Sequence, residues 1–305
     1  MLRYRDLLWI SMISMLLMIL VSPGIEAAQW TAMDSGTENT LKAVWGTSSS
    51  DVFAVGRAGT ILHYDGNGWT GIESNTKNAL NGVWGASSQD VFVVGDDGLI
   101  LHYDGSTWTP MESGTENTLM AVWGSSGSDV FAVGDWGTIL HYDGSTWTTM
   151  NSGSTQPLYR IWGNSGSDVF TVGRFGTVRH YNGSAWIEED SGISNQLNGI
   201  WGASSDNVFA TDIYGTVLHY NGKLWKVKTP ATIKGGTINQ LNGVWWRSVN
   251  NVIAVGQQGM ILFYDGTTWT TMAAEETKTH LFGVWASHDG DAFAVGEKGM
   301  IFLYK

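Results

Sequence analysis

The sequence predicts an all-β fold, a seven-bladed β-propeller of four-stranded antiparallel blades that occupies residues 29–305. One observation is a repeat: a Val-Trp or Ile-Trp pair recurs seven times, and successive copies are 39, 39, 39, 39, 44 and 40 residues apart, a spacing typical of repeat architectures. The other is that the last copy stops one strand early, while a matching strand precedes the first copy. The tryptophans of these pairs are Trp45, Trp84, Trp123, Trp162, Trp201, Trp245 and Trp285.

Within one repeat, four short runs of apolar and aromatic residues alternate with turn residues. In the clearest copy the runs cover residues 119–123, 129–133, 138–142 and 147–150. Runs of four or five residues rich in Val, Ile, Phe, Tyr and Trp, bounded by Gly, Ser and Asp, favour strands over helices. The Gly-Asp-Trp-Gly and Asp-Gly-Ser-Thr connections supply the backbone angles that tight hairpins need. Each repeat is therefore predicted to be a four-stranded meander.

The two ends of the array predict a closed ring. The last repeat ends at Tyr304 and Lys305, where six earlier copies continue through Asp-Gly or Asn-Gly into a further strand with a tryptophan. Residues 29–33 match the strand at 147–150. We expect this N-terminal strand to complete the last blade, because closure removes the exposed sheet edges of an open array.

Residues 1–28 are predicted to be a signal peptide. Arg3 and Arg5 come first, residues 7–21 are mostly apolar, and small residues lead to Ala28. The apolar stretch is shorter than the roughly 20 residues of a membrane-spanning helix. The expected location is periplasmic or extracellular, and the alternative is an anchor formed by an uncleaved N-terminal segment.

Composition excludes several classes of function. Hydrophobic residues make up 43% of the chain, enough for a packed core. The 16 basic and 28 acidic side chains give a net charge of -12, so no nucleic-acid partner is expected. The absence of cysteine excludes disulfides, thiolate metal ligands and a cysteine nucleophile. Because no P-loop or dinucleotide fingerprint is present, we expect no cofactor. We also expect no metal site, and a monomer.

Three residue types recur at fixed positions of the repeat and are predicted to be structural. Fourteen of the 17 tryptophans fall in two such columns, where they are expected to fill the space between blades. A histidine column that includes His63 and His102 is expected to bond polar neighbours, because packed sheets are about 10 Å apart and their side chains cannot converge on one ion. An acidic column that includes Asp51 becomes Asn207 in blade five, which favours turn hydrogen bonding over acid–base work. No EF-hand spacing supports calcium.

Candidate binding residues lie where the repeats disagree. The turns between the second and third strands share one face of the ring with the blade-to-blade connections, and their residues vary, whereas the opposite face is nearly constant. Blades three, four and five place Trp136, Phe175 and Tyr214 at these turns. Exposed aromatic side chains suit stacking on sugars or burial against a protein.

Blade four departs furthest from the repeat. Arg160 replaces the Ala or Gly of the other first strands, and Arg179 stands where five other third strands have Leu. We expect these cations to reach the central channel or its mouth, where the neighbouring Tyr159, Arg174 and Asp135 would add an aromatic and charged patch. The alternative is that the arginines pair with nearby acids such as Asp135 or turn out to solvent.

The order Val-Trp-Gly, Ser-Asp-Val-Phe-Ala-Val-Gly, Gly-Thr-Ile-Leu-His-Tyr-Asp-Gly and Trp-Thr resembles bacterial propeller repeats of the photosystem II stability/assembly-factor-like kind. The Tyr-Asp-Gly-Ser-Thr-Trp segment is also similar to a degenerate Asp-box of sialidase-like propellers. The resemblance spans all seven repeats and implies a propeller with a partner-binding role in assembly or surface recognition. No catalytic residue is carried over from either family.

These patterns predict a non-catalytic exported scaffold that binds a protein or a glycan. The alternatives are a multivalent lectin, in which near-identical blades each bind a sugar, and a glycoside hydrolase or lyase that uses the central channel. A lectin would use the repeated columns, and an enzyme would need convergent carboxylates or a nucleophile with its base.

Overall fold

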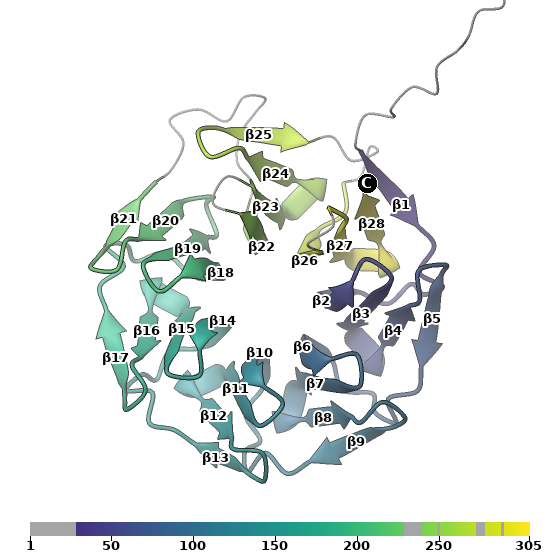
Figure 1. Ribbon diagram of the computed structural model, residues 1–305, viewed down its shortest axis with the longest axis horizontal. Coiled ribbons are helices and arrows are strands. Elements are labelled where there is room, and N and C mark those ends of the chain that lie inside the picture. Colours follow the sequence, from purple (N-terminus) through teal and green to yellow (C-terminus); the bar gives the residue numbers. More distant parts are fainter. Residues whose placement is uncertain (1–28, 229–239, 249–250, 273–277, 288–289) are drawn as a thin grey trace, which may run out of the picture.

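The protein is a ring of seven four-stranded sheets around a central axis (Figure 1). The computed structural model describes residues 29–228, 240–248, 251–272, 278–287 and 290–305. The predicted signal peptide, and most of the long connection that follows Val227, lie outside the described residues. Within the described ranges there is no helix whose length and apolar character would let it cross a membrane. The predicted propeller is confirmed.

Six blades run from the axis to the rim in chain order, and the seventh takes its outermost strand from the N-terminal end of the ring. The bounds recur from blade to blade. The innermost strands are β2 (Leu41–Ser48), β6 (Leu80–Ser87), β10 (Leu119–Ser126), β14 (Leu158–Ser165), β18 (Leu197–Ser204), β22 (Leu241–Ser248) and β26 (Leu281–Ala286). The second strands are β3 (Asp51–Gly56), β7 (Asp90–Gly95), β11 (Asp129–Gly134), β15 (Asp168–Gly173), β19 (Asn207–Asp212), β23 (Asn251–Gly256) and β27 (Ala292–Gly296). The third strands are β4 (Ile61–Tyr64), β8 (Ile100–Tyr103), β12 (Ile139–Tyr142), β16 (Val178–Tyr181), β20 (Val217–Tyr220), β24 (Ile261–Tyr264) and β28 (Ile301–Tyr304).

The outermost strands form the rim of the ring. They are β5 (Trp69–Ile72), β9 (Trp108–Met111), β13 (Trp147–Thr149), β17 (Trp186–Glu189), β21 (Trp225–Val227), β25 (Trp269–Met272) and, in the seventh blade, β1 (Trp30–Met33). In six blades the second and third strands are joined by a 3-10 turn. These turns are η1 (Arg57–Gly59), η2 (Asp96–Gly98), η3 (Asp135–Gly137), η4 (Arg174–Gly176), η5 (Gln257–Gly259) and η6 (Glu297–Gly299).

The N-terminal strand closes the ring. β1 pairs antiparallel with β28, and the register places Trp30 opposite Tyr304 and Met33 opposite Ile301. The Gln29 backbone N–H also donates to the Lys305 carbonyl at 3.2 Å. The strand from one end of the repeat array therefore completes the sheet formed at the other end, as the sequence predicts.

Tryptophans of the innermost strands join neighbouring blades. The Trp84 ring lies against Gly124 of the next blade so closely that a Cβ added there would be 2.6 Å from its Cη2 atom. Trp45 and Trp123 contact Gly85 and Gly163 in the same way. In five of the seven repeats a glycine follows the tryptophan, and in the contacts above this glycine leaves room for the indole of the preceding blade. The predicted inter-blade role is confirmed, and these tryptophans also line the central channel.

The second tryptophan column fills the outer part of the same interfaces. Trp108 of β9 meets Phe53 of the preceding blade edge-on, with ring centroids 6.3 Å apart and planes at 80°. Trp186 meets Phe131 in the same geometry at 6.2 Å. Edge-to-face pairs of this kind add to the stabilisation gained from burying the rings. Phenylalanines on the second strands are accordingly among the most buried side chains of the protein.

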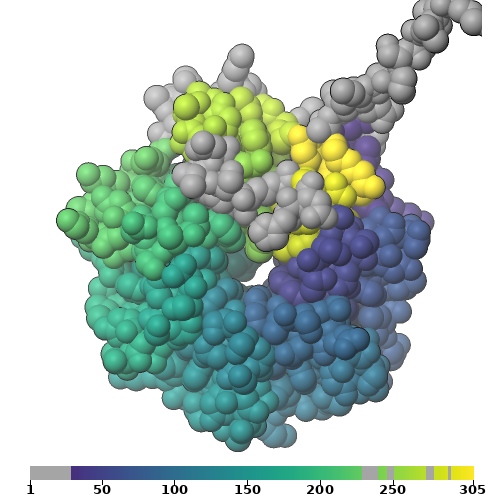
Figure 2. All heavy atoms as spheres, viewed as in Figure 1, coloured from purple at the N-terminus to yellow at the C-terminus, as the bar shows by residue number. Residues whose placement is uncertain are grey.

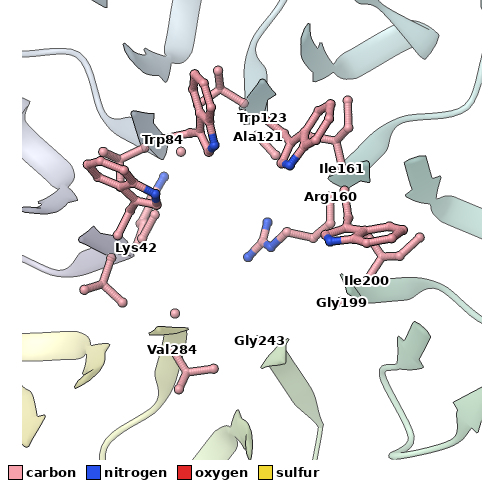
Figure 3. Close-up of a pocket in the computed structure, with 18 of the residues that line it drawn as sticks. Lys42, Trp84, Ala121, Trp123, Arg160, Ile161, Gly199, Ile200, Gly243 and Val284 are labelled. Carbon is pink, nitrogen blue, oxygen red and sulfur yellow. The ribbon is translucent and has the colours of Figure 1, made fainter. Parts of the chain in front are cut away.

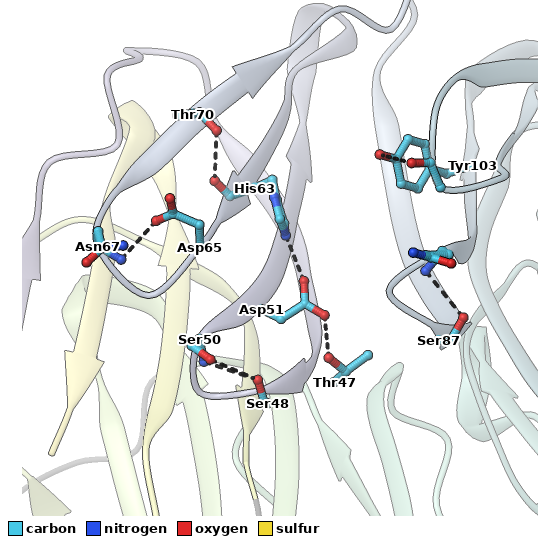
Figure 4. A network of polar contacts seen from close by, with 12 residues as sticks. Thr47, Ser48, Ser50, Asp51, His63, Asp65, Asn67, Thr70, Ser87 and Tyr103 are labelled. Atoms are coloured by element: carbon cyan, nitrogen blue, oxygen red, sulfur yellow. Dashed lines mark hydrogen bonds and ion pairs between the residues drawn. The ribbon is translucent and has the colours of Figure 1, made fainter.

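The histidine and acidic columns bond to each other. His63 Nε2 lies 2.7 Å from Asp51 Oδ1, and the Thr47 hydroxyl donates to the second oxygen of that carboxylate (Figure 4). The same 2.7 Å contact joins His102 to Asp90 and, in blade five, His219 to Asn207. The hydrogen-bonding role predicted for both columns is confirmed. Asp51 contacts a histidine on the adjacent third strand and also accepts a bond from Thr47, near the turn that precedes its own strand.

Candidate functional site

The turns between the second and third strands hold their central residue in a left-handed conformation. Trp136 in η3 has a φ of 58°, and Phe175 in η4 has a φ of 56°. Each turn is closed by a backbone bond such as that from Thr138 N–H to the Asp135 carbonyl, at 3.0 Å. This conformation favours glycine or asparagine and is uncommon for bulky residues. The backbone therefore gives no structural reason for an aromatic side chain at either position.

Three aromatic side chains stand out from consecutive blades on this face. Trp136 is 74% exposed, Phe175 is 60% exposed and Tyr214 is 68% exposed. An exposed large aromatic group costs hydration free energy, because its apolar surface is left in water. We call these three residues the aromatic tips.

Tyr214 is held by a different turn. In blade five Asp212 replaces the glycine that ends the second strand of the other blades. Its buried carboxylate accepts hydrogen bonds from the backbone N–H groups of Tyr214 at 2.8 Å and Thr216 at 2.6 Å. Asn195 donates to its second oxygen at 2.7 Å. Sequence reasoning missed Asp212, although the change from Val-Gly to Thr-Asp in blade five marks it.

Beside the tips, Tyr159, Arg174 and Asp135 form a charged cluster. The Arg174 guanidinium lies over the Phe175 ring, 4.7 Å from its centroid, a cation–π contact. Partial burial raises the pKa of the Tyr159 hydroxyl, the Arg174 charge opposes this rise, and the Asp135 charge adds to it. Burial raises the pKa of Asp135 as well, and so does the carboxylate of Asp96 on blade two. The structure therefore brings these three predicted residues together near the channel mouth.

Arg160, the remaining predicted residue, occupies the central channel. Its guanidinium points into the middle of the channel (Figure 3). One nitrogen donates to the Tyr159 carbonyl at 2.8 Å, and the other donates to the Asn242 carbonyl of β22 at 3.4 Å. Burial inside the ring lowers the pKa of Arg160 to about 10. The alternative of an Arg160–Asp135 ion pair does not occur.

Arg179 does not reach the channel, and that expectation is wrong. Arg179 lies on β16, the third strand, well away from the axis. Its guanidinium forms an ion pair with Glu188 on the neighbouring strand at 3.0 Å and donates to the Gly153 carbonyl at 2.8 Å. The register that places Arg179 directly opposite Glu188 explains the pair. Arg179 is thus a structural substitution at the rim side of blade four.

The channel itself is a cavity of about 220 Å³ lined by all seven innermost strands. Figure 2 shows the ring hollowed at its centre. Sequence reasoning missed Lys42, which lines the cavity from blade one. The signal was weak, because the position before the small-residue column holds Asn in three blades and four other residue types in the rest. That position contributes to the channel wall. Within the described residues, His, Asp and Glu form no group of three or more that could hold a metal ion.

Sequence comparison finds no match among protein-family profiles or among curated proteins. Similar solved structures are a YCF48 bound to a D1 peptide, at 16% identity and a TM-score of 0.74, and the WD40 propeller domain of Doa1, at 13% identity and a TM-score of 0.76. They cover 93% and 92% of this chain, and 99% and 97% of their own chains. A third similar structure, YCF48 from Cyanidioschyzon merolae, shares 15% identity over 91% of this chain and 99% of its own, with a TM-score of 0.73. The expected resemblance to photosystem II assembly-factor propellers is confirmed at the level of the fold.

Proposed function

We propose that this protein is a non-catalytic binding scaffold whose partner is a protein that docks on the aromatic tips. The observation that carries the proposal is the exposure of Trp136, Phe175 and Tyr214 on three consecutive blades. Aromatic side chains dominate the binding energy of protein interfaces, and here a rigid ring presents them without loss of backbone entropy. A similar propeller is known with a bound D1 peptide, which supports a protein ligand for this architecture.

The charged cluster would flank this interface. Arg174 is fixed against Phe175 by the cation–π contact, so its remaining N–H groups can bond a partner at little entropic cost. Asp135 offers an acceptor on the neighbouring blade, next to Trp136. Export of the mature chain remains part of the proposal, because residues 1–28 follow the order of a signal peptide.

The test is a pull-down that compares the wild-type chain with Trp136→Asn/Phe175→Asn/Tyr214→Ala. Asparagine tolerates the left-handed backbone, so folding should be retained. Removing one hot-spot side chain costs about 2 kcal/mol, which corresponds to about 30-fold in affinity. Recovery of the partner by the triple variant should therefore fall by at least this factor. Gln258→Asn, a change at the equivalent turn of blade six, is the matched control. Undiminished recovery by the triple variant refutes the proposal.

A glycan partner and a multivalent lectin are addressed by the same variants on a glycan array. A lectin should bind several equivalents of one sugar, because its sites repeat. The equivalent turn positions carry Ala58, Asp97, Gln258 and Lys298 in other blades, so the tips themselves do not repeat.

An enzyme that uses the channel mouth is the second candidate, and one observation favours it. Burial raises the pKa of Asp135, and the charge of Asp96 raises it further, which is the direction that suits the general acid of a glycoside hydrolase. Hydrolysis of aryl glycosides by the wild type, lost in Asp135→Asn, would support this candidate over the scaffold.

A further inference from the structure

Arg160 is a cation inside the ring without an acidic partner. The described ion pairs join Arg179 to Glu188 and histidines to acidic residues, and none includes Arg160. Its two hydrogen bonds go to backbone carbonyls, which leaves three of the five guanidinium N–H groups without a described acceptor. Charged groups removed from water are normally paired, because an unpaired charge is costly there.

Lys42 adds a second cation on the opposite wall of the channel (Figure 3). Its ammonium donates to the Asn81 side-chain oxygen. Burial lowers the pKa of Lys42, and the charges of Arg57 and Arg160 lower it further, while Asp96 alone opposes them. Asp96 is itself held by the Asn81 amide at 2.9 Å. Two like charges therefore face one channel, and the Asp96 carboxylate offsets the charge of Lys42 but does not act on Arg160.

The walls between these cations are apolar and aromatic. Trp84 and Trp123 turn the N–H edges of their indoles toward the channel, so the polar groups exposed there are mainly donors (Figure 3). The cavity of about 220 Å³ is smaller than the roughly 300–1,000 Å³ of pockets for drug-sized ligands. It fits one small ring that carries a single acidic group.

We propose that the central channel binds a small organic carboxylate, with its acid group between the Arg160 guanidinium and the Lys42 ammonium and its apolar body against the tryptophans. A planar carboxylate matches the guanidinium fork and supplies the missing counter-charge. This site goes beyond the proposed function, because it can be filled whether or not a protein binds the aromatic tips.

Benzoate is the probe, and benzamide is its neutral counterpart of the same shape. Benzoate at ten times its dissociation constant should raise the melting temperature of the mature chain by about 2–4 °C, and benzamide should leave it unchanged. The benzoate should also change tryptophan fluorescence, because tryptophans line the cavity. An equal shift with benzamide overturns the proposal.

The variant Arg160→Met removes the cation and keeps the length of the side chain. It should lose the benzoate shift, and without ligand it should melt above the wild type, because an unpaired charge has been removed from the ring. Lys223→Met, on an exposed turn at the rim, makes the same change in net charge and should keep the shift. A benzoate shift retained in Arg160→Met overturns the proposal. If that variant does not fold, Arg160→Lys should weaken benzoate at least tenfold, and unchanged affinity is then the overturning result.

Two further arms separate the site from the proposed function and identify the source of the carboxylate. The variant without aromatic tips should keep the full benzoate shift, so the channel site can stand even if partner binding fails. Loss of that shift overturns an independent channel site. If benzoate displaces a captured protein, the carboxylate is a side chain of that protein, and if it does not, the ligand is a free small molecule.

Discussion

Trp30 is expected to hold the ring shut. Its side chain is 1% exposed and packs against Tyr304, with ring centroids 5.3 Å apart, and it belongs to a buried cluster with Phe302 and Ile253. A tryptophan buries about 200 Å², which at about 25 cal/mol per Å² is worth about 5 kcal/mol, and an alanine retains about 1 kcal/mol of this. The Trp30 indole nitrogen is buried without a described acceptor, so its removal returns about 1 kcal/mol. Trp30→Ala should therefore lower the free energy of unfolding by about 3 kcal/mol.

Urea unfolding of residues 29–305, followed by circular dichroism at 25 °C, measures this loss. With a slope of about 3 kcal/mol per molar urea, the midpoint should fall by about 1 M. Trp30→Phe is the matched control: it keeps an aromatic ring and removes the unpaired N–H, so it should stay within about 1 kcal/mol of the wild type. Trp108→Ala, at the equivalent position of blade two, should cost a similar amount.

Ring closure predicts a larger loss of stability when the whole strand β1 is removed than when one buried side chain is removed. β1 is tied to the last blade only by strand pairing and side-chain packing, because chain continuity joins it to blade one. Deletion of residues 29–33 should therefore destabilise the protein more than Trp30→Ala and expose an edge of β28 that promotes association. The reasoning is wrong if Trp108→Ala costs several kcal/mol while Trp30→Ala and the deletion leave the urea midpoint unchanged.

Two further predictions concern the repeated contacts. Gly124→Ala should cost about 1–3 kcal/mol, because its Cβ would meet the Trp84 ring at 2.6 Å, whereas Gly71→Ala, with nothing within 4 Å of its Cβ, should be neutral in the same urea assay. Hydrogen bonds from the outer turns lower the pKa of four exposed aspartates below the usual 3.8, and at Asp104 to about 2. The stability that these carboxylates contribute is therefore present above a pH of about 4 and is lost as the pH falls toward about 2. These aspartates are Asp65, Asp104, Asp143 and Asp265. Replacing all four by asparagine, which blades four and five already use in Asn182 and Asn221, should flatten the fall of the melting temperature with acid, and an unchanged slope would contradict this origin.

The roles of the repeated positions could be predicted because the residue at each of them makes the same kind of contact from blade to blade. The Trp84–Gly124 contact and the His63–Asp51 bond are set by strand register, which repeats with the sequence. Residues that act only once leave a weaker signal. Lys42 stands in a column that holds Asn in three blades and four other residue types in the rest, so its approach to the channel could not be separated from surface variation before the strand was placed next to the axis.

The two arginines of blade four show that a departure from the repeat cannot be interpreted without knowing which strand of the blade carries it. Both replace small or apolar residues, yet Arg160 is on the strand nearest the axis and Arg179 is two strands farther out. Arg179 satisfies its charge with Glu188, which is opposite it in the register. A cross-strand comparison of the sequence alone could have found this pair, whereas no such partner exists for Arg160 among the described residues.

The departures that remain unexplained by folding lie together, and each has an energetic cost. Trp136, Phe175 and Tyr214 are large aromatic side chains that stand in solvent. Arg160 is half-buried inside the channel and has no acidic partner among the described residues. Proteins commonly break local rules at functional sites and recover the stability elsewhere, here from the tryptophan contacts between seven similar blades. Scattered neutral drift would distribute such costly residues around the ring, but they fall on blades three to five and at the adjoining channel, where a partner and a small anion could relieve those costs by covering the rings and pairing the charge.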